Sequence, residues 1–321
     1  MTQSLVVGVD AGATSTRVAV HALDGTRVGY ARAGAGNPTA HGMAKAVAAV
    51  GAALGEALGR LDGAQVVASL TGVAGHVEEM ALELAKIWAD HGIAEGPRYT
   101  GDVQIAYAAG SPEPDGSLLL SGTGAVAARI TDHSLNTVAD GLGWLLGDEG
   151  SGFWIGRRAV KELVGALDKG MPVPPGDRVT GGGALAELVV EHFLGDQRPA
   201  SPRETAIRIV RLAQADHMRL AALSTLVSQA AEAGDPSAVK IAHKAADHLV
   251  TTLRRVHVSG PVVLAGSVLT SDGPVRRAVV ELLAGERVAT AGDAAGAAAW
   301  LAARDLLPDA KKLHATFTSA A

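Results

Sequence analysis

The sequence predicts an α/β protein built from two lobes. Three segments support this prediction, because each is an apolar strand that ends in a turn of glycine and small polar residues. In residues 6–22 and 117–130 the turn joins two apolar runs, as in a β-hairpin. In residues 262–269 the strand leads through a Gly-Ser turn toward a helix expected to begin near Pro274. Two such hairpins, about a hundred residues apart, indicate two lobes with related openings.

The turn of the first hairpin has the chemistry of an anion-binding loop. Gly12 lets the backbone approach an anion because it has no Cβ, and successive N–H groups in such a turn form a concavity for anions. Asp10, at the end of the strand, can hold hydrated Mg²⁺ beside phosphates. Alone, this turn equally suits a solvated β-turn, but the second hairpin favours phosphate binding. The candidate phosphate-binding residues are Gly12, Ala13, Thr14, Ser15, Gly122, Thr123 and Gly124.

Composition excludes several classes of protein. The chain has 321 residues, enough for two domains with their own cores, and 48% of them are hydrophobic. Its net charge of -5 and the lack of a basic stripe argue against a nucleic-acid partner. No apolar run approaches the roughly 20 residues of a membrane span, and the first twenty residues do not resemble a secretory signal. We therefore expect a cytoplasmic protein without a membrane partner.

The pattern of apolar runs and turns also predicts the order of elements. Residues 4–34 form three strands with a turn at Asp24-Gly25, and the Pro-rich segment 111–116 separates the lobes. Further predicted elements are a strand at 66–70, a strand ending at 99–102, helices at 43–61, 77–91 and from 103, a surface loop at 171–183, a helical block at 184–257, and a last helix from 292 to about 306. The histidines of the helical block are expected to be surface or packing residues.

Four polar residues are candidates for chemistry, each with a simpler alternative. Asp102 follows a strand, where an aspartate most often caps a helix. Asn37 precedes a proline and can begin a turn or offer its amide to sugar hydroxyls. Asp148 and Glu149 form either an acidic turn before a helix capped by Ser151 or a pair that binds vicinal hydroxyls. The nearby Trp144 is expected in the core rather than as a sugar platform.

The order of these motifs resembles the sugar-kinase, heat-shock ATPase and actin superfamily. Within it, the chain is similar to the family of N-acetylglucosamine kinases and BadF-type ATPases, with overall proportions most like actinobacterial glucosamine kinases. The residues that carry the resemblance are Asp10-Ala11-Gly12-Ala13-Thr14, Gly36-Asn37, Gly101-Asp102, Ser121-Gly122-Thr123-Gly124 and the longest match, at residues 141–152. The resemblance covers nearly the whole chain.

The resemblance implies a two-lobed actin-like (ribonuclease H-like) ATPase fold with its active site in the cleft between the lobes. An N-terminal lobe of residues 1–116 would be joined by a C-terminal helix at about 293–308, and residues 117–292 would form the other lobe. The absence of cysteine excludes the cysteine-bound iron–sulfur cluster of some BadF-type relatives. A homodimer remains an option.

The resemblance also implies roles for single residues. Asp102 would be the catalytic base, and Asp10 would bind Mg²⁺. ATP would contact both hairpin turns together with Gly266 and Ser267, and the substrate would contact Asn37, Gly143, Asp148 and Glu149. Gln104 is expected to reach the C2 substituent of the substrate, because it lies one turn into the helix from Asp102. The implied reaction is transfer of a phosphoryl group from ATP to the O6 hydroxyl of glucosamine, a small-molecule amino sugar. The alternatives are an N-acetylglucosamine kinase and a non-catalytic sugar-binding regulator or partner ATPase.

Overall fold

A computed structural model describes residues 3–75, 78–173 and 183–319 of the chain. The chain divides into two compact units, which we call unit 1 and unit 2. Unit 1 comprises residues 1–116, 130–136 and 289–321, and unit 2 comprises residues 117–129 and 137–288. Most of the loop predicted at 171–183 and the first residue of the helix predicted at 77–91 lie outside the described residues.

Unit 1 contains a five-stranded sheet in the order β3-β2-β1-β4-β5. The predicted three N-terminal strands are confirmed as β1 (Leu5–Ala11), β2 (Thr16–Ala22) and β3 (Arg27–Ala33), which pair antiparallel. The predicted turn between the last two is also confirmed, with Gly25 at φ 89. β4 (Val66–Val73) runs parallel to β1, and β5 (Arg98–Gly101) runs parallel to β4. The carboxyl ends of β1, β4 and β5 therefore lie at one edge of the sheet.

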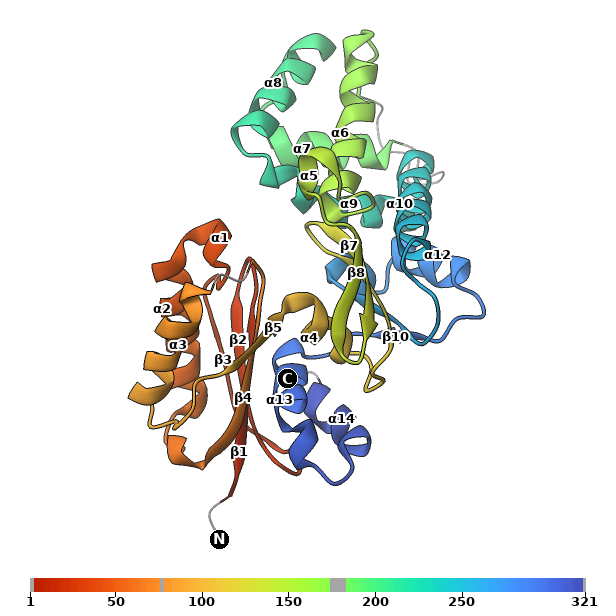
Figure 1. Ribbon diagram of the computed structural model, residues 1–321. Helices are drawn as coiled ribbons and strands as arrows, with labels where there is room; N and C mark the ends of the chain where they lie inside the picture. Colours follow the sequence, from red (N-terminus) through yellow and green to blue (C-terminus); the bar gives the residue numbers. More distant parts are fainter. Residues whose placement is uncertain (1–2, 76–77, 174–182, 320–321) are drawn as a thin grey trace. The chain divides into compact units, whose positions relative to one another are not determined.

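Helices cover both faces of this sheet, as Figure 1 shows. One face packs against α2 (Met43–Leu58) and α3 (Glu79–Asp90), and the other against α4 (Asp102–Ala108), α13 (Ala294–Ala303) and α14 (Ala310–Thr318). Shorter elements are α1 (Pro38–His41), η1 (Gly63–Gln65) and η2 (Arg304–Leu306). The prediction that the helix opening near residue 292 is the last one was wrong. α14 follows it, anchored by Trp300, whose indole N–H donates to the Ala310 carbonyl at 2.8 Å.

Packing between β1 and α13 is unusually close. β1 alternates, so that Leu5, Val7 and Val9 join one core while Val6 joins the other. At Gly8 the backbone of α13 lies directly on the strand, and a Cβ there would be 2.0 Å from the Ala295 carbonyl oxygen. Most residues of α13 are alanine or glycine, and its residues from Ala295 to Ala303 are all buried. The small side chains predicted from the low aromatic content thus allow a helix to lie against the sheet.

Unit 2 repeats the plan of unit 1. Its sheet has the order β10-β9-β6-β7-β8, so that in both units the first strand lies between the second and the fourth in chain order. The strands are β6 (Gly116–Ser121), β7 (Ala125–Thr131), β8 (Ser134–Asp140), β9 (Val262–Ala265) and β10 (Val288–Thr290), and β6 runs parallel to β9. The predicted α/β class and the relation between the two hairpins are confirmed.

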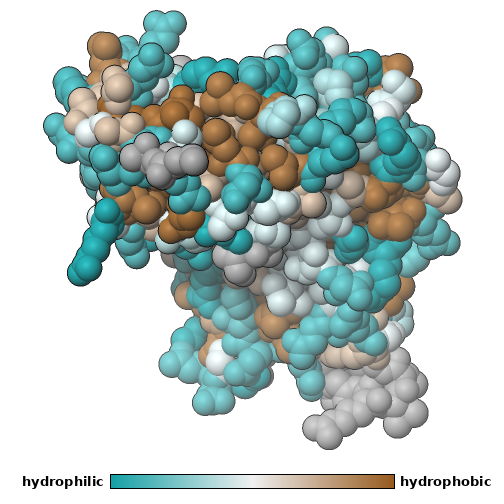
Figure 2. All heavy atoms as spheres, turned by 90° about the horizontal axis from the view of Figure 1, so that it is seen from below, coloured by the Kyte–Doolittle hydropathy of each residue, from teal (hydrophilic) through white to brown (hydrophobic). Residues whose placement is uncertain are grey.

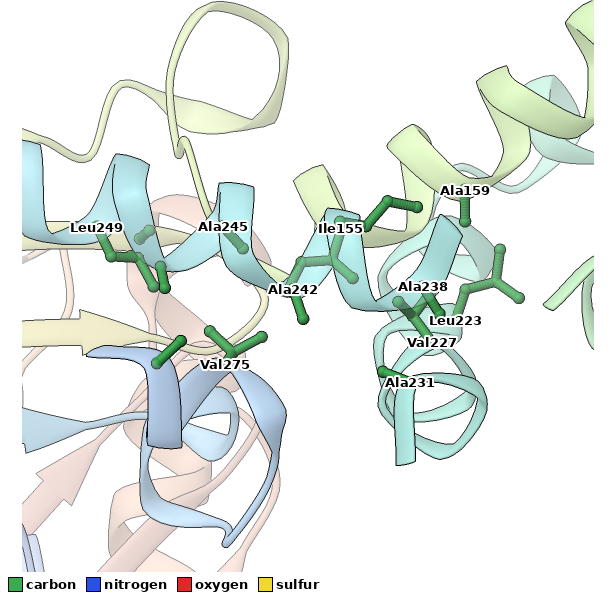
Figure 3. Close-up of a cluster of buried hydrophobic side chains, with 14 of the residues drawn as sticks. Ile155, Ala159, Leu223, Val227, Ala231, Ala238, Ala242, Ala245, Leu249 and Val275 are labelled. Atoms are coloured by element: carbon green, nitrogen blue, oxygen red, sulfur yellow. The ribbon is translucent and has the colours of Figure 1, made fainter. Parts of the chain in front are cut away.

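The predicted helical block is four helices packed into one core. α6 (Gly152–Asp168) precedes them, followed by α7 (Ala184–Leu194), α8 (Pro202–Ala215), α9 (Met218–Glu232) and α10 (Pro236–Arg254). Figure 3 shows Ile155 of α6 near Leu223 and Val227 of α9, with a row of alanines along α10. Short helices are α5 (Gly143–Leu146) and α11 (Ser267–Thr270), and α12 (Pro274–Leu282) begins where a helix was predicted.

Apolar side chains also reach the surface. Figure 2, which views the molecule of Figure 1 from below, shows apolar residues gathered on that face. In unit 1, the exposed ones include Val67 and Leu306, which line a shallow hollow together with Val66 and Ile93. None of the helices in the described part of the chain is long and apolar enough to cross a membrane.

Candidate functional site

Two carboxylates lie at the sheet edge of unit 1 where three strands end. Asp10 is the penultimate residue of β1, and Asp102 directly follows β5. Asp10 is only 8% exposed, and its pKa is raised by burial and, to a smaller degree, by the negative charge of Asp102. The structure therefore brings together the predicted metal ligand and the predicted base.

Asp102 is the first residue of α4 rather than its cap. Gly101 occupies the N-cap position, and no side chain caps this helix. Among the described residues, the carboxylate of Asp102 accepts hydrogen bonds from nearby backbone alone, including one from the Val103 N–H at 3.0 Å. The helix-cap interpretation was therefore wrong. Burial raises the pKa of Asp102, which makes the ionised carboxylate a stronger proton acceptor.

Asp10 forms an ion pair that sequence reasoning missed. It is the register partner of Arg17 across β1 and β2, and the two side chains meet at 2.8 Å between Arg17 Nη1 and Asp10 Oδ2. Among the described residues, no group of three or more acidic or histidine side chains could hold a metal ion. Mg²⁺ is often held by one or two carboxylates plus water and substrate phosphates, so Asp10 Oδ1 fits a cation of that kind.

The β1–β2 turn is held by its own backbone and by the following loop. The Gly12 N–H donates to the Ser15 carbonyl, and the Gly36 N–H donates to the Gly12 carbonyl, both at 3.0 Å. His41 Nε2 lies 2.9 Å from the Ala13 carbonyl oxygen. Ala13 and Thr14 are exposed at the tip. The turn thus has a fixed shape whose tip can meet an anion.

The two predicted sugar contacts of unit 1 have different hydrogen bonding. Asn37 caps α1, because its Oδ1 accepts from the N–H groups of Thr39 and Ala40 at 2.9 and 3.0 Å. Its amide nitrogen is therefore the group left for a ligand. Gln104 Oε1 is buried, and no described residue hydrogen-bonds to it. An acceptor of this kind suits the N–H or O–H of a bound ligand.

In unit 2 the second hairpin turn meets the Gly-Ser turn predicted after β9. Gly266 has φ 80, and a Cβ there would lie 2.3 Å from the Ser121 carbonyl oxygen, so only glycine allows this approach. The start of α6 closes the turn from the other side: the Gly152 N–H donates to the Gly122 carbonyl at 2.8 Å. The structure therefore brings Gly122–Gly124 together with Gly266 and Ser267.

The acidic segment is organised by Asp140, which sequence reasoning also missed. Asp140 accepts bonds from the backbone N–H groups of Asp148 at 2.8 Å and Glu149 at 2.9 Å. Asp148 has φ 56, and its carboxylate accepts backbone bonds from Ala125 and Gly143. Burial raises the pKa of Asp148. The only sequence signal for Asp140 was its place before a glycine at a strand end.

Glu149 and Ser151 complete this segment. Glu149 is half-buried, and its Oε2 lies 3.7 Å from His248 Nε2. Ser151 caps α6 by accepting from the Trp154 N–H at 3.1 Å, as predicted. Of the two acids, Glu149 therefore has the carboxylate less committed to the backbone.

The expectation of a core tryptophan was wrong. Trp144 is 42% exposed and stacks on His217, with ring centroids 5.0 Å apart. It lies in α5, a single turn whose leucines are also exposed, and Leu146 is 82% exposed. One turn of helix on the surface has no second layer to cover it. The expectation that His217 is a surface or packing residue is confirmed, because it is exposed and stacks on Trp144.

The two repeated units and their glycine turns define the class of actin-like sugar-kinase folds. Three solved structures share the fold. A protein proposed to be an N-acetylglucosamine kinase, from Chromobacterium violaceum, has a TM-score of 0.69 and 24% identity over 94% of this chain and 99% of that one. A similar proposed kinase from Porphyromonas gingivalis has a TM-score of 0.60 and 20% identity over 89% and 93%. A ROK family glucokinase from Streptomyces griseus has a TM-score of 0.56 and 19% identity over 94% and 100%.

Sequence comparison gives the family. Residues 7–300 match the BadF/BadG/BcrA/BcrD ATPase family, and the chain belongs to it. A relative in Clostridium acetobutylicum, an N-acetylmuramic acid/N-acetylglucosamine kinase, is 26% identical over 155 residues. That match covers 48% of this chain and 46% of the relative, so it spans less than half of the relative's length.

Proposed function

We propose that this protein is an ATP-dependent kinase that phosphorylates the O6 hydroxyl of an amino sugar. The observation that carries the proposal is the half-buried carboxylate of Asp102 at the same edge of the sheet as the buried Asp10, where three parallel strands end. Catalysis of phosphoryl transfer asks mainly for positioning and for stabilisation of charge. The names of the relative and of the similar structures support a sugar as the acceptor.

In this proposal Asp102 and Asp10 of unit 1 bind the proton and the cation, and the glycine turns of both units bind the phosphates. The carboxylate of Asp102 accepts the proton of the sugar hydroxyl as its oxygen attacks the terminal phosphorus, and the bond from phosphorus to the ADP oxygen breaks. Asp10 would hold Mg²⁺ through Oδ1 and ordered water. Bound Mg²⁺ would neutralise charge that develops on the phosphates. The N–H groups of Gly12 and Gly122 already donate to the carbonyls of Ser15 and Gly124, so the other backbone N–H groups of the turns at 12–15 and 122–124 would bind phosphate oxygens.

The acceptor sugar is glucosamine or N-acetylglucosamine. Glucosamine carries an ammonium group at C2, which requires a carboxylate partner when it is bound away from water. Because Asp148 accepts backbone bonds, Glu149 is the acid of this segment that we assign to that group. N-acetylglucosamine, the alternative, is supported by the names of the relatives. Asn37, Gln104 and Gly143 would contact either sugar.

The test of the base is the variant Asp102→Asn, with the exposed Asp90→Asn as matched control. We expect kcat to fall by about 10²–10⁴ in the first variant and to stay unchanged in the control. Burial raises the pKa of Asp102, and the ionised form is the active one. The rate should therefore rise with pH through a pKa above the usual value of about 3.9. The rate of Asp102→Asn should not show this rise with pH. A folded Asp102→Asn variant with normal turnover and the same rise of rate with pH as the wild type would contradict the assignment.

The acceptor is tested by ADP release with glucosamine, N-acetylglucosamine, glucose and mannosamine. If Glu149 binds the ammonium group, Glu149→Gln should lower kcat/KM for glucosamine by about tenfold to a hundredfold and leave glucose unchanged. Turnover of N-acetylglucosamine equal to or above that of glucosamine would assign the acetylated sugar instead. Binding of sugar without turnover of any of the four would favour the non-catalytic alternative.

A further inference from the structure

Arg17 lies in a row of charged residues across the sheet of unit 1. It is the register partner of Asp10 on β1 and of Arg32 on β3. Residues in register on one face have their Cβ atoms about 5 Å apart, and like charges at such positions destabilise the sheet. Asp10 supplies one negative charge next to two positive ones. The row therefore keeps one positive charge in excess.

The guanidinium of Arg17 is held in place by Asp10 and keeps hydrogen-bond donors for a ligand. A guanidinium has five N–H donors, and the bond from Nη1 to Asp10 takes one of them. The side chain is 39% exposed, so the remaining donors can reach a ligand. In the described part of the chain, no second acceptor for Arg17 is found. Because Asp10 is buried and lies on a central strand, the ion pair fixes where the guanidinium points.

Its place in the chain directs it to the candidate site. Arg17 is the second residue of β2, so it directly follows the turn whose tip carries Ala13 and Thr14. Asp10, its partner, lies near enough to Asp102 to sense its charge. The positive group is thus paired with a carboxylate that lies at the same edge of the sheet as Asp102, the predicted base.

We propose that Arg17 binds the terminal phosphate of the nucleotide and that Asp10 is its positioning residue. The inference rests on the proposed function, which supplies a nucleoside triphosphate as the ligand. The planar guanidinium can donate two parallel N–H bonds to phosphate oxygens, as ammonium groups cannot. Asp10 then has two tasks, since Oδ2 holds Arg17 while Oδ1 would be left to bind Mg²⁺.

The experiment is calorimetric binding of Mg·ATP and Mg·ADP, without sugar, to the full-length protein. The variants are Arg17→Gln, Arg17→Lys and, as matched control, Arg32→Gln, which removes a positive charge from the same row. We expect Arg17→Gln to weaken ATP by about tenfold or more and ADP by less than about threefold, with Arg17→Lys between it and the wild type. Arg32→Gln should change both affinities by less than about twofold.

Removal of Arg17 leaves the buried Asp10 carboxylate unpaired, which can reduce stability. The double variant Asp10→Asn/Arg17→Gln leaves no unpaired carboxylate and should lose at least as much ATP affinity as Arg17→Gln, because it also removes the candidate Mg²⁺ ligand, with folding checked by thermal melting. Equal losses for Arg17→Gln and Arg32→Gln, or equal losses of ATP and ADP, would overturn the proposal. If Arg17 controls ATP affinity in a protein that phosphorylates no sugar, the proposed function fails and this inference stands. If the kinase is active and Arg17→Gln binds ATP normally, only this inference fails.

Discussion

The turn at Gly122 allows a test of nucleotide binding that leaves the fold intact. A Cβ at this position would have Gly266 Cα and Ser267 N as its nearest neighbours, both at 3.8 Å, which is ordinary van der Waals contact. Gly122 is not among the left-handed glycines of the described residues. We therefore expect Gly122→Ala to change the free energy of unfolding by at most about 1 kcal/mol.

The same methyl group should weaken nucleotide binding. It would enter the gap between the two segments of unit 2 that are assigned to the nucleotide. If it displaces one charge-assisted hydrogen bond to a phosphate, the loss is about 1.5–3 kcal/mol, or roughly tenfold to a hundredfold in ATP affinity. A substitution that lowers ATP affinity without lowering stability indicates a glycine that faces the ligand, whereas a substitution that lowers stability indicates a structural glycine.

Gly266→Ala is the structural counterpart. Its φ of 80 and ψ of 151 lie in a region that is nearly restricted to glycine, and the added Cβ would meet the Ser121 carbonyl oxygen at 2.3 Å. Strain and overlap together should cost about 3 kcal/mol or more of stability. The melting temperature should fall in this variant and not in Gly122→Ala.

The assay combines thermal melting with calorimetric titration of Mg·ATP. The reasoning is refuted if Gly122→Ala binds ATP as the wild type does, because the space beside the turn would then be irrelevant to the nucleotide. It is also refuted if Gly122→Ala is destabilised as much as Gly266→Ala, because the geometry of the turn would then be wrong.

Two further predictions concern stability and its pH dependence at buried positions of unit 1, with comparison positions in unit 2. Gly8→Ala should lower the free energy of unfolding by more than about 3 kcal/mol, because its Cβ would overlap the backbone of α13. Gly165→Ala should raise it by about 0.5–1 kcal/mol, because the space around Gly165 is open. Urea unfolding measures both changes, and normal stability of Gly8→Ala would contradict the close packing of β1 on α13. Burial lowers the pKa of His21, so the unfolded chain binds the proton more readily. Stability should fall as pH drops below about 6.5, by up to about 1.4 kcal/mol per pH unit. Urea unfolding at several pH values should show a flatter dependence for His21→Asn but not for the exposed His243→Asn, and equal slopes would refute the role of His21.

Much of the fold follows from local sequence. The strands β1 to β3 were predicted because apolar alternation and turn residues are local signals, and the Ser151 cap because its pattern spans only a few residues. The helix α14 was missed, since its apolar positions acquire meaning only through the helix α13 that it packs against. The burial of Trp144 was predicted wrongly for a related reason. Residue type indicates a preference for burial, but the elements packed around a residue decide whether it is buried.

The sequence by itself determined which chemical groups the candidate site offers: the turn glycines, Asp10, Asp102 and the acidic pair at 148–149. Only the tertiary structure decided how these groups are used. Strand register makes Arg17 the partner of Asp10, and the loop after β8 brings the N–H groups of Asp148 and Glu149 to the carboxylate of Asp140. Pairing between strands and contacts of loops join residues through space, and their energies depend on distance and burial, which no local pattern of residues specifies.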